Sequence, residues 1–260
     1  MLGLNGGLMG VRKVPTTGTA TGVWVSNEQV LAKRAGIWPA GAGGDPTPSL
    51  SPVLWYDFAD ETTVTTSGTE ITAVTSKGSR AWTLSKSATG PQYVTGINSK
   101  KCVDWGSPGH GNYLRNTTGT STTIAEVYVV LDANFGSTFA TYNGLITGTS
   151  GAGFLLLGNL NGTGLYGSEF TTAFIDGSAS NVHSSGVLPA INSPCILRVG
   201  RSSGSFNTTD GFQIGYDRIY GARGWGGLIG EVIVFSTALS STDRDSLQAW
   251  LAAKWGVTLV

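Results

Sequence analysis

The chain has 260 residues, a formal net charge of zero and a charged fraction of 12%, against ~25% in an ordinary domain. Glycine is abundant, at 39 residues, and serine and threonine are plentiful. A neutral chain without a basic run gives no support for nucleic-acid binding through phosphate neutralisation. No run reaches the ~18 apolar residues that a membrane span needs. We therefore expect neither nucleic acid nor membrane as a partner.

The first part of the chain, residues 1–45, predicts an extended arm that carries one short helix. Residues 1–22 are rich in glycine and threonine without periodicity, and their start lacks the basic region of a signal peptide. Ser26 is expected to cap the helix and Gln29 to complete a capping box, while Gly36 can end it.

This short helix is marginal in isolation and needs a surface to pack on. A Gly/Pro/Ser linker at residues 40–52 separates it from the rest of the chain. We expect its apolar face to be buried against a different chain, and packing on its own domain is the alternative. The expected anchor residues are Trp24, Val30, Leu31, Arg34 and Trp38.

The second part, residues 46–260, predicts one all-β domain. Apolar or alternating runs recur along it, and each is bounded by turn residues such as Gly, Asn and Ser. This spacing is typical of a two-sheet antiparallel β-sandwich or jelly roll. The clearest expected strands are 53–58, 81–84, 101–105, 123–131, 144–147, 153–157, 195–201, 212–216 and 228–235.

The chain is predicted to close with an amphipathic helix that covers apolar surface of the sandwich. Ser240 is the expected N-cap, Asp243 completes a capping box and also favours the positive end of the helix dipole, and Gly256 ends the helix. The residues expected on its buried face are Leu247, Trp250, Leu251 and Trp255.

The cysteines and histidines do not form a metal-binding pattern. Cys102 and Cys195 lie far apart and are expected to be buried free thiols, with a disulfide as the alternative in an oxidising compartment. His110 and His183 lie in Gly/Ser-rich loops and are expected to be exposed. No zinc-ligand spacing results.

The carboxylates do not form the motif of a glycoside hydrolase. Retaining hydrolysis needs two carboxylates ~5 Å apart, and no strand region carries a Glu-x-Asp-x-x-Glu run. The densest acidic cluster is Asp57, Asp60 and Glu61, and others, including Glu126 and Glu231, are isolated. We expect no enzyme and no cofactor. Calcium remains a candidate without a nominated site.

One short string imitates a hydrolase motif, and several aromatic residues are candidates for sugar binding. Residues 200–204 match G-x-S-x-G, but they follow an apolar strand and enter a Ser/Gly turn, so a hairpin turn is expected. An exposed aromatic ring could stack on a sugar, although the same residue types also fill β-sandwich cores. The candidate rings are Trp82, Trp105, Tyr113, Tyr142, Tyr166 and Tyr220.

Four segments of the β domain resemble concanavalin A-like lectin/glucanase domains of the laminin-G-like type. These segments are 54–58, 77–78, 91–93 and 254–256. The resemblance implies a concanavalin A-like jelly roll over residues 46–260. It also implies a domain that binds or assembles and usually does no chemistry.

The segment 22–29, continuing through Arg34 to residues 37–39, resembles the N-terminal pieces of tailed-phage structural proteins. This resemblance implies a protein made in the host cytoplasm and built into the virion, as a tail appendage or fibre or as a head-decorating protein. Residues 1–45 would attach it to other virion proteins, and we expect a homo-oligomer in the particle. Host-surface glycan is a further candidate partner of the projecting domain. The alternatives are a free carbohydrate-binding lectin and, less favoured, a glycoside hydrolase.

Overall fold

The computed structural model describes residues 47–116, 121–133, 142–151, 153–158, 165–167, 169–180, 194–208 and 210–260. The chain divides into two units, Met1–Pro46 and Thr47–Val260, and every described residue belongs to the second. The expected N-terminal helix and its anchor residues lie outside the described residues, as does His183. Those anchor residues are Trp24, Val30, Leu31, Arg34 and Trp38.

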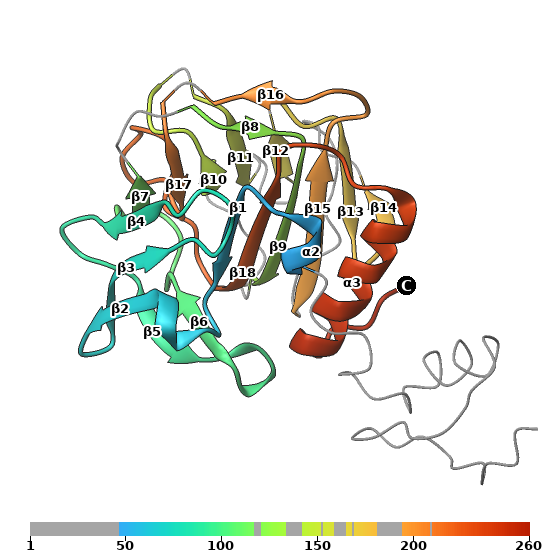
Figure 1. The fold of residues 1–260 in the computed structure, drawn as a ribbon. Coiled ribbons are helices and arrows are strands. Elements are labelled where there is room, and N and C mark those ends of the chain that lie inside the picture. The colour runs from blue at the N-terminus through green and yellow to red at the C-terminus, as the bar shows by residue number, and fades with distance from the viewer. Residues whose placement is uncertain are drawn as a thin grey trace, which may run out of the picture. The chain divides into compact units, whose positions relative to one another are not determined.

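Antiparallel strands are the dominant secondary structure of Thr47–Val260 (Figure 1). The strands are β1 Leu54–Asp57, β2 Val64–Ser67, β3 Glu70–Thr75, β4 Thr83–Lys86, β5 Gln92–Thr95, β6 Lys101–Asp104, β7 Leu114–Asn116, β8 Thr123–Ile124, β9 Glu126–Asp132, β10 Gly144–Thr147, β11 Leu155–Gly158, β12 Leu165–Gly167, β13 Thr172–Ile175, β14 Ser178–Ser180, β15 Cys195–Gly200, β16 Phe206–Asn207, β17 Phe212–Ile214 and β18 Leu228–Phe235. The helices are α2 Thr47–Leu50 and α3 Ser241–Trp255, with short 3-10 turns η1 Glu61–Thr63 and η2 Ile97–Ser99.

The strands form one large sheet and one small sheet. The large sheet runs β12-β11-β10-β17-β7-β4-β3-β5-β6-β18-β9-β15-β13-β14, while β1 pairs with β18 and β2 with β3. The small sheet pairs β16 with β8. The expected all-β class with a C-terminal helix is confirmed.

The large sheet folds over on itself around a common core. The core joins Val129 of β9 and Val232 of β18 to Ile146 of β10 and Ile214 of β17. The rings of Tyr56 and Phe212 lie 6.0 Å apart between centroids in this core. Because side chains alternate along a strand, the same strands β1, β9, β15 and β18 present a second set of residues on their outer face.

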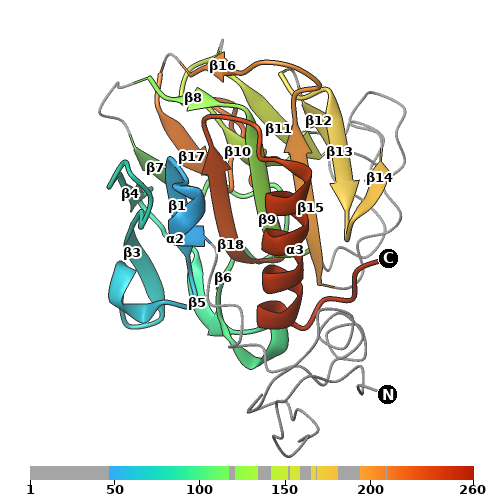
Figure 2. The same cartoon turned by 45° about the vertical axis from the view of Figure 1, so that its right-hand side comes forward.

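That outer face is covered by α3, which lies along β18, β9 and β15 (Figure 2). Leu247, Leu251 and Trp255 of α3 pack there, as expected, and Trp250 is half-buried at the edge. A side chain at position 230 would place its Cβ only 2.6 Å from the Trp255 ring, so Gly230 is what lets the indole lie on the sheet. The residues that receive α3 include Trp55, Tyr128, Val130, Ile196, Ile233 and Phe235.

The predicted ends of α3 are confirmed. The Ser240 hydroxyl oxygen accepts a hydrogen bond from the Asp243 backbone N–H at 3.1 Å, and the same hydroxyl donates to the Asp243 carboxylate at 2.7 Å. Gly256 adopts a left-handed φ of 68°, which glycine reaches without a Cβ penalty.

Several sequence predictions need correction in detail. The expected strand 123–131 is two strands, β8 and β9, and the expected turn at residues 200–204 is not a hairpin. β15 before that turn pairs with β9 and β13, whereas β16 after it pairs with β8. The segment therefore connects two sheets and leads into a strand, without the helix of a hydrolase elbow.

Both cysteines are buried free thiols, as expected. Cys195 belongs to the core inside the folded sheet, and Cys102 belongs to the cluster under α3. The two thiols therefore lie in different cores and do not form the disulfide that was the alternative. Burial raises the pKa of the Cys102 thiol to about 11, so this group stays protonated at neutral pH.

Candidate functional site

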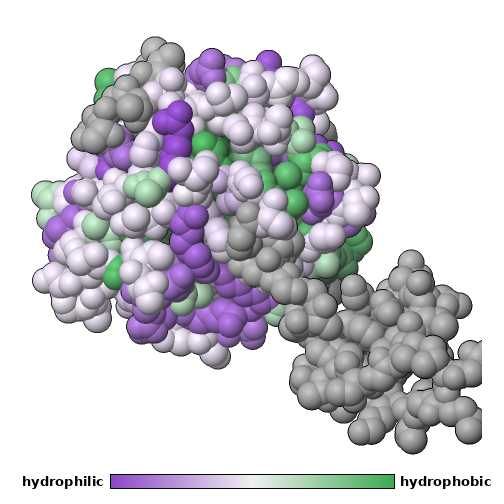
Figure 3. Space-filling view, viewed as in Figure 1, coloured by the Kyte–Doolittle hydropathy of each residue, from purple (hydrophilic) through white to green (hydrophobic). Residues whose placement is uncertain are grey.

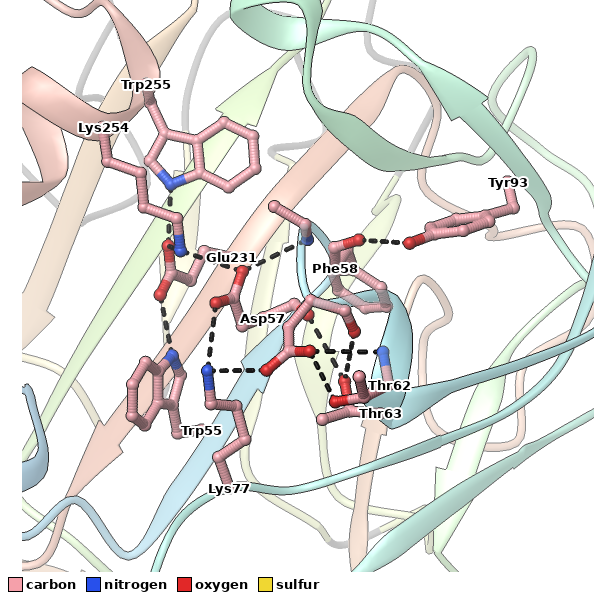
Figure 4. A network of polar contacts seen from close by, with 12 residues as sticks. Trp55, Asp57, Phe58, Thr62, Thr63, Lys77, Tyr93, Glu231, Lys254 and Trp255 are labelled. Atoms are coloured by element: carbon pink, nitrogen blue, oxygen red, sulfur yellow. Dashed lines mark hydrogen bonds and ion pairs between the residues drawn. The ribbon is translucent and has the colours of Figure 1, made fainter.

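A buried pair of carboxylates lies where β1 meets β18, under the end of α3 (Figure 4). Asp57 and Glu231 are opposite each other in the strand register and are 5% and 1% exposed. Lys254 of α3 reaches both, with Nζ 2.9 Å from Asp57 Oδ1 and 2.8 Å from Glu231 Oε2. The indole N–H groups of Trp55 and Trp255 each donate to Glu231 at 2.7 Å. Glu231 Oε2 thus holds α3 on the sheet through Lys254 and Trp255, while Oε1 accepts from Trp55 of β1.

The charges around Glu231 are not fully balanced, which affects its protonation. Lys77 lies 2.9 Å from Asp60 and 3.3 Å from Asp57, so two ammonium groups face three carboxylates in this network. Burial raises the pKa of Glu231 from its ordinary value of 4.5 to about 7, and the nearby Asp57 carboxylate adds to the effect. One proton would neutralise the network.

The same network explains the acidic cluster seen in the sequence. The Lys77 ammonium lies between Asp57 and Asp60, while Glu61 is exposed at the start of η1. In the part of the chain that the structure describes, no group of three or more acidic, His or Cys side chains is placed to hold a metal ion.

A second buried glutamate anchors the other end of α3. Glu126 of β9 is 2% exposed and receives Arg244 Nε at 3.0 Å and the Leu239 backbone N–H at 3.1 Å. The Tyr128 hydroxyl also donates to it at 3.0 Å, and Arg198 Nη1 lies 3.3 Å away. The sequence marked Glu126 and Glu231 only as isolated acids, but each one fixes an end of α3.

The strongest candidate for a binding site lies on the part of the folded sheet that α3 does not cover, around β7, β17 and the loop that follows β17. We name it the Tyr–Arg surface. It consists of Tyr113, Arg115, Tyr142, Tyr216, Arg218, Tyr220 and Arg223.

Arginine side chains hold the tyrosine rings of the Tyr–Arg surface in place. The guanidinium carbon of Arg115 lies 4.1 Å from the centre of the Tyr113 ring, and that of Arg218 lies 4.8 Å from the Tyr220 ring. Arg223 stacks between two rings, at 4.7 Å from Tyr220 and 5.1 Å from Tyr142. The attraction between a guanidinium group and a ring face restricts the motion of a partly exposed ring.

The arginines are themselves fixed by buried acceptors. Asp217 is fully buried and accepts from Arg218 Nε at 2.8 Å and Arg223 Nη1 at 2.9 Å. Arg115 donates to the Gln213 side chain at 2.7 Å and to the Arg218 carbonyl at 2.9 Å. The rings are therefore organised before any ligand arrives.

Exposure and backbone strain coincide at this surface. Ile219 and Tyr220 are 61% and 38% exposed. One face of the described domain is mostly pale or hydrophilic, with hydrophobic side chains gathered toward the right of the view (Figure 3). Tyr142, Arg218 and Ala222 have φ values of 59°, 50° and 56°, in the left-handed region that non-glycine residues seldom adopt. Strain of this kind gathers at functional sites.

The structure sorts the aromatic candidates from the sequence. Tyr113, Tyr142 and Tyr220 come together at the Tyr–Arg surface, whereas Trp105 is buried and Trp82 packs half-buried against the core. The side chain of Tyr166 lies outside the described residues. Sequence reasoning missed the three arginines, although Arg-x-Tyr-x-x-Arg at residues 218–223 was a visible signal.

His110 differs from its prediction. It is half-buried and stacks on Trp105 with ring centroids 6.1 Å apart, because the loop carrying it folds over the core. Burial lowers the pKa of the His110 imidazole, and its Nδ1 accepts from the Asn112 backbone N–H at 3.0 Å.

No protein-family model matches this chain, and no curated protein matches it. None of the described helices is both long and apolar enough to cross a membrane.

Proposed function

We propose that this chain is a non-enzymatic phage virion protein whose β domain binds host-surface glycan through the Tyr–Arg surface. In this proposal residues 1–45 attach the protein to other virion proteins, with Trp24 and Trp38 among the buried anchors. Residues 46–260 form a concanavalin A-like jelly roll that projects from the particle. The observation that carries the glycan proposal is the set of half-exposed tyrosine rings held by fixed arginines.

The chemistry of the Tyr–Arg surface suits a sugar. Pyranose rings present apolar C–H faces that stack on aromatic rings, and their hydroxyls take hydrogen bonds from nearby polar groups. Tyr220 offers the most exposed ring, and Tyr113 and Tyr142 lie beside arginines that share its network. Because the arginines are already held by Asp217 and by carbonyl oxygens, little side-chain entropy is lost on binding.

The carboxylates support a binding role over a hydrolytic one. Hydrolysis needs one carboxylate as acid and another as base or nucleophile, both in contact with substrate. The facing pair Asp57 and Glu231 lies under α3, and its oxygens are occupied by Lys254 and two indoles. That pair is suited to fastening the helix.

A glycan array probed with the full chain tests the proposal. We expect binding to a restricted set of glycans, and we expect Tyr220→Ala to abolish that signal. Ile219→Ala is the matched control, since this neighbour is more exposed but has no ring to stack. Binding lost equally in both variants would show that the signal does not depend specifically on the Tyr220 ring and would contradict the stacking proposal. Glycan binding without particle association would favour the free lectin.

A further inference from the structure

The outer face of the layer that carries α3 contains a pocket away from the Tyr–Arg surface. It has a volume of about 310 Å³ and lies between the ends of β9, β13 and β15 and the first turns of α3. Its lining includes Glu126, Phe174, Arg198, Arg201, Ser202 and Arg244. This volume accommodates a small organic molecule.

The pocket carries an excess of one positive charge. Arg198, Arg201 and Arg244 line it, and the carboxylates paired with them are Glu126 and Glu169. Three guanidinium groups against two carboxylates favour a ligand with one negative charge. A second negative charge on the ligand would add repulsion from Glu126, which lines the pocket.

Arg198 is the residue most clearly prepared for a ligand. It is 9% exposed, and its guanidinium carbon lies 3.6 Å from the centre of the Phe174 ring. Its Nη1 lies 3.3 Å from Glu126, and its buried Nε has no hydrogen-bond partner among the described residues. A buried donor without a partner costs free energy. A ligand carboxylate that accepts two hydrogen bonds from the Arg198 guanidinium would recover that cost.

We propose that this pocket binds a small monoanionic, hydroxylated molecule through its carboxylate, of the size and chemistry of a single sugar acid. The carboxylate pairs with Arg198, with Arg244 adding charge at the rim. Ser202 and Thr172 offer hydroxyls to the body of the ligand. This site is independent of the glycan-binding proposal, because it lies on the other layer and shares no residue with the Tyr–Arg surface.

Titration calorimetry of the full chain with sodium glucuronate tests the pocket, with glucose and inorganic phosphate as comparison probes. We expect saturable glucuronate binding and none with glucose. Arg198→Gln should weaken it by at least ~10-fold, as expected for a lost charge-assisted hydrogen bond. Arg80→Gln is the charge-matched control, at an exposed arginine beside Trp82, and should leave the affinity unchanged.

Gly200→Ala provides a second variant that leaves every charge in place. The added methyl group would lie 3.2 Å from the Ala125 backbone oxygen, a tight contact, and 3.5 Å from Thr172 Oγ1 and 3.6 Å from Glu126 Cγ, among residues that line the pocket. We expect weaker glucuronate binding with an unchanged circular dichroism spectrum. Absence of saturable glucuronate binding, tighter binding of phosphate, or equal weakening by Arg80→Gln would each overturn the proposal.

Discussion

The helix-covered face and the Tyr–Arg surface use charged groups in opposite ways. Under α3, the carboxylates Glu126 and Glu231 are buried, and their oxygens are taken by arginine, lysine, indole and backbone donors. At the Tyr–Arg surface, a single buried carboxylate, Asp217, holds two arginines whose other faces support exposed rings.

For the Glu231 network and the Tyr–Arg surface, this difference separates stability from glycan recognition. A buried carboxylate whose oxygens already accept several hydrogen bonds has no acceptor capacity left for a ligand. Removing it leaves several buried donors without a partner. A partly exposed ring that is already ordered can bind a ligand at low entropic cost. We therefore expect variants of the buried Glu231 network to change stability, and variants of the Tyr–Arg surface to change glycan binding.

The largest expected effect follows removal of the Glu231 carboxylate. Glu231→Ala leaves two buried indole N–H groups without their acceptor and takes away one of the two carboxylates that pair with Lys254. We therefore expect a loss of ~3–5 kcal/mol in the free energy of unfolding. Urea denaturation measures it. The control Glu61→Ala, at an exposed position, should change that free energy by less than ~0.5 kcal/mol. Equal stability of the two variants would refute the anchoring role.

A pH dependence of stability follows from the raised pKa of Glu231. Between its ordinary value of 4.5 and about 7, the folded protein holds a proton that the unfolded chain has lost. Stability therefore falls as pH rises through this window, by on the order of 1 kcal/mol per pH unit for this group. Glu231→Gln cannot titrate, so its urea midpoint should lack this component of the slope. An unchanged slope in Glu231→Gln would contradict the assignment.

The smallest expected effect on stability follows removal of residues 1–40. Both core clusters described here lie within Thr47–Val260, so we expect the free energy of unfolding to change by less than ~0.5 kcal/mol. The truncated protein should stay soluble but fail to join the phage particle in a sedimentation assay. A truncated chain that still assembles would show that the attachment surface lies elsewhere.

The parts of the fold that were predictable carry local signals. The strands β10 and β18 have the predicted bounds because each is mostly apolar, although β18 also contains Gly230 and Glu231. The helix α3 was predictable from Ser240 and Gly256, whose capping roles are local. The strands β3 and β13 were missed because most of their side chains are only half-buried, and each gains its conformation from strands paired on both sides.

The candidate site was predictable only by residue type. Tyrosine rings could be named as sugar platforms, but their exposure depends on tertiary packing. Arg115 and the Arg218 carbonyl that holds it are separated by 103 positions, so no local pattern connects them. The anchoring roles of Glu126 and Glu231 depend on a helix that arrives from the end of the chain.

One titration tests the central claim most directly: calorimetry of the array-selected glycan with the wild type, Tyr220→Ala and Glu231→Gln at a temperature where all three are folded. We predict at least ~10-fold weaker binding for Tyr220→Ala and wild-type affinity for Glu231→Gln. Wild-type affinity in Tyr220→Ala, or a loss confined to Glu231→Gln, would contradict the account.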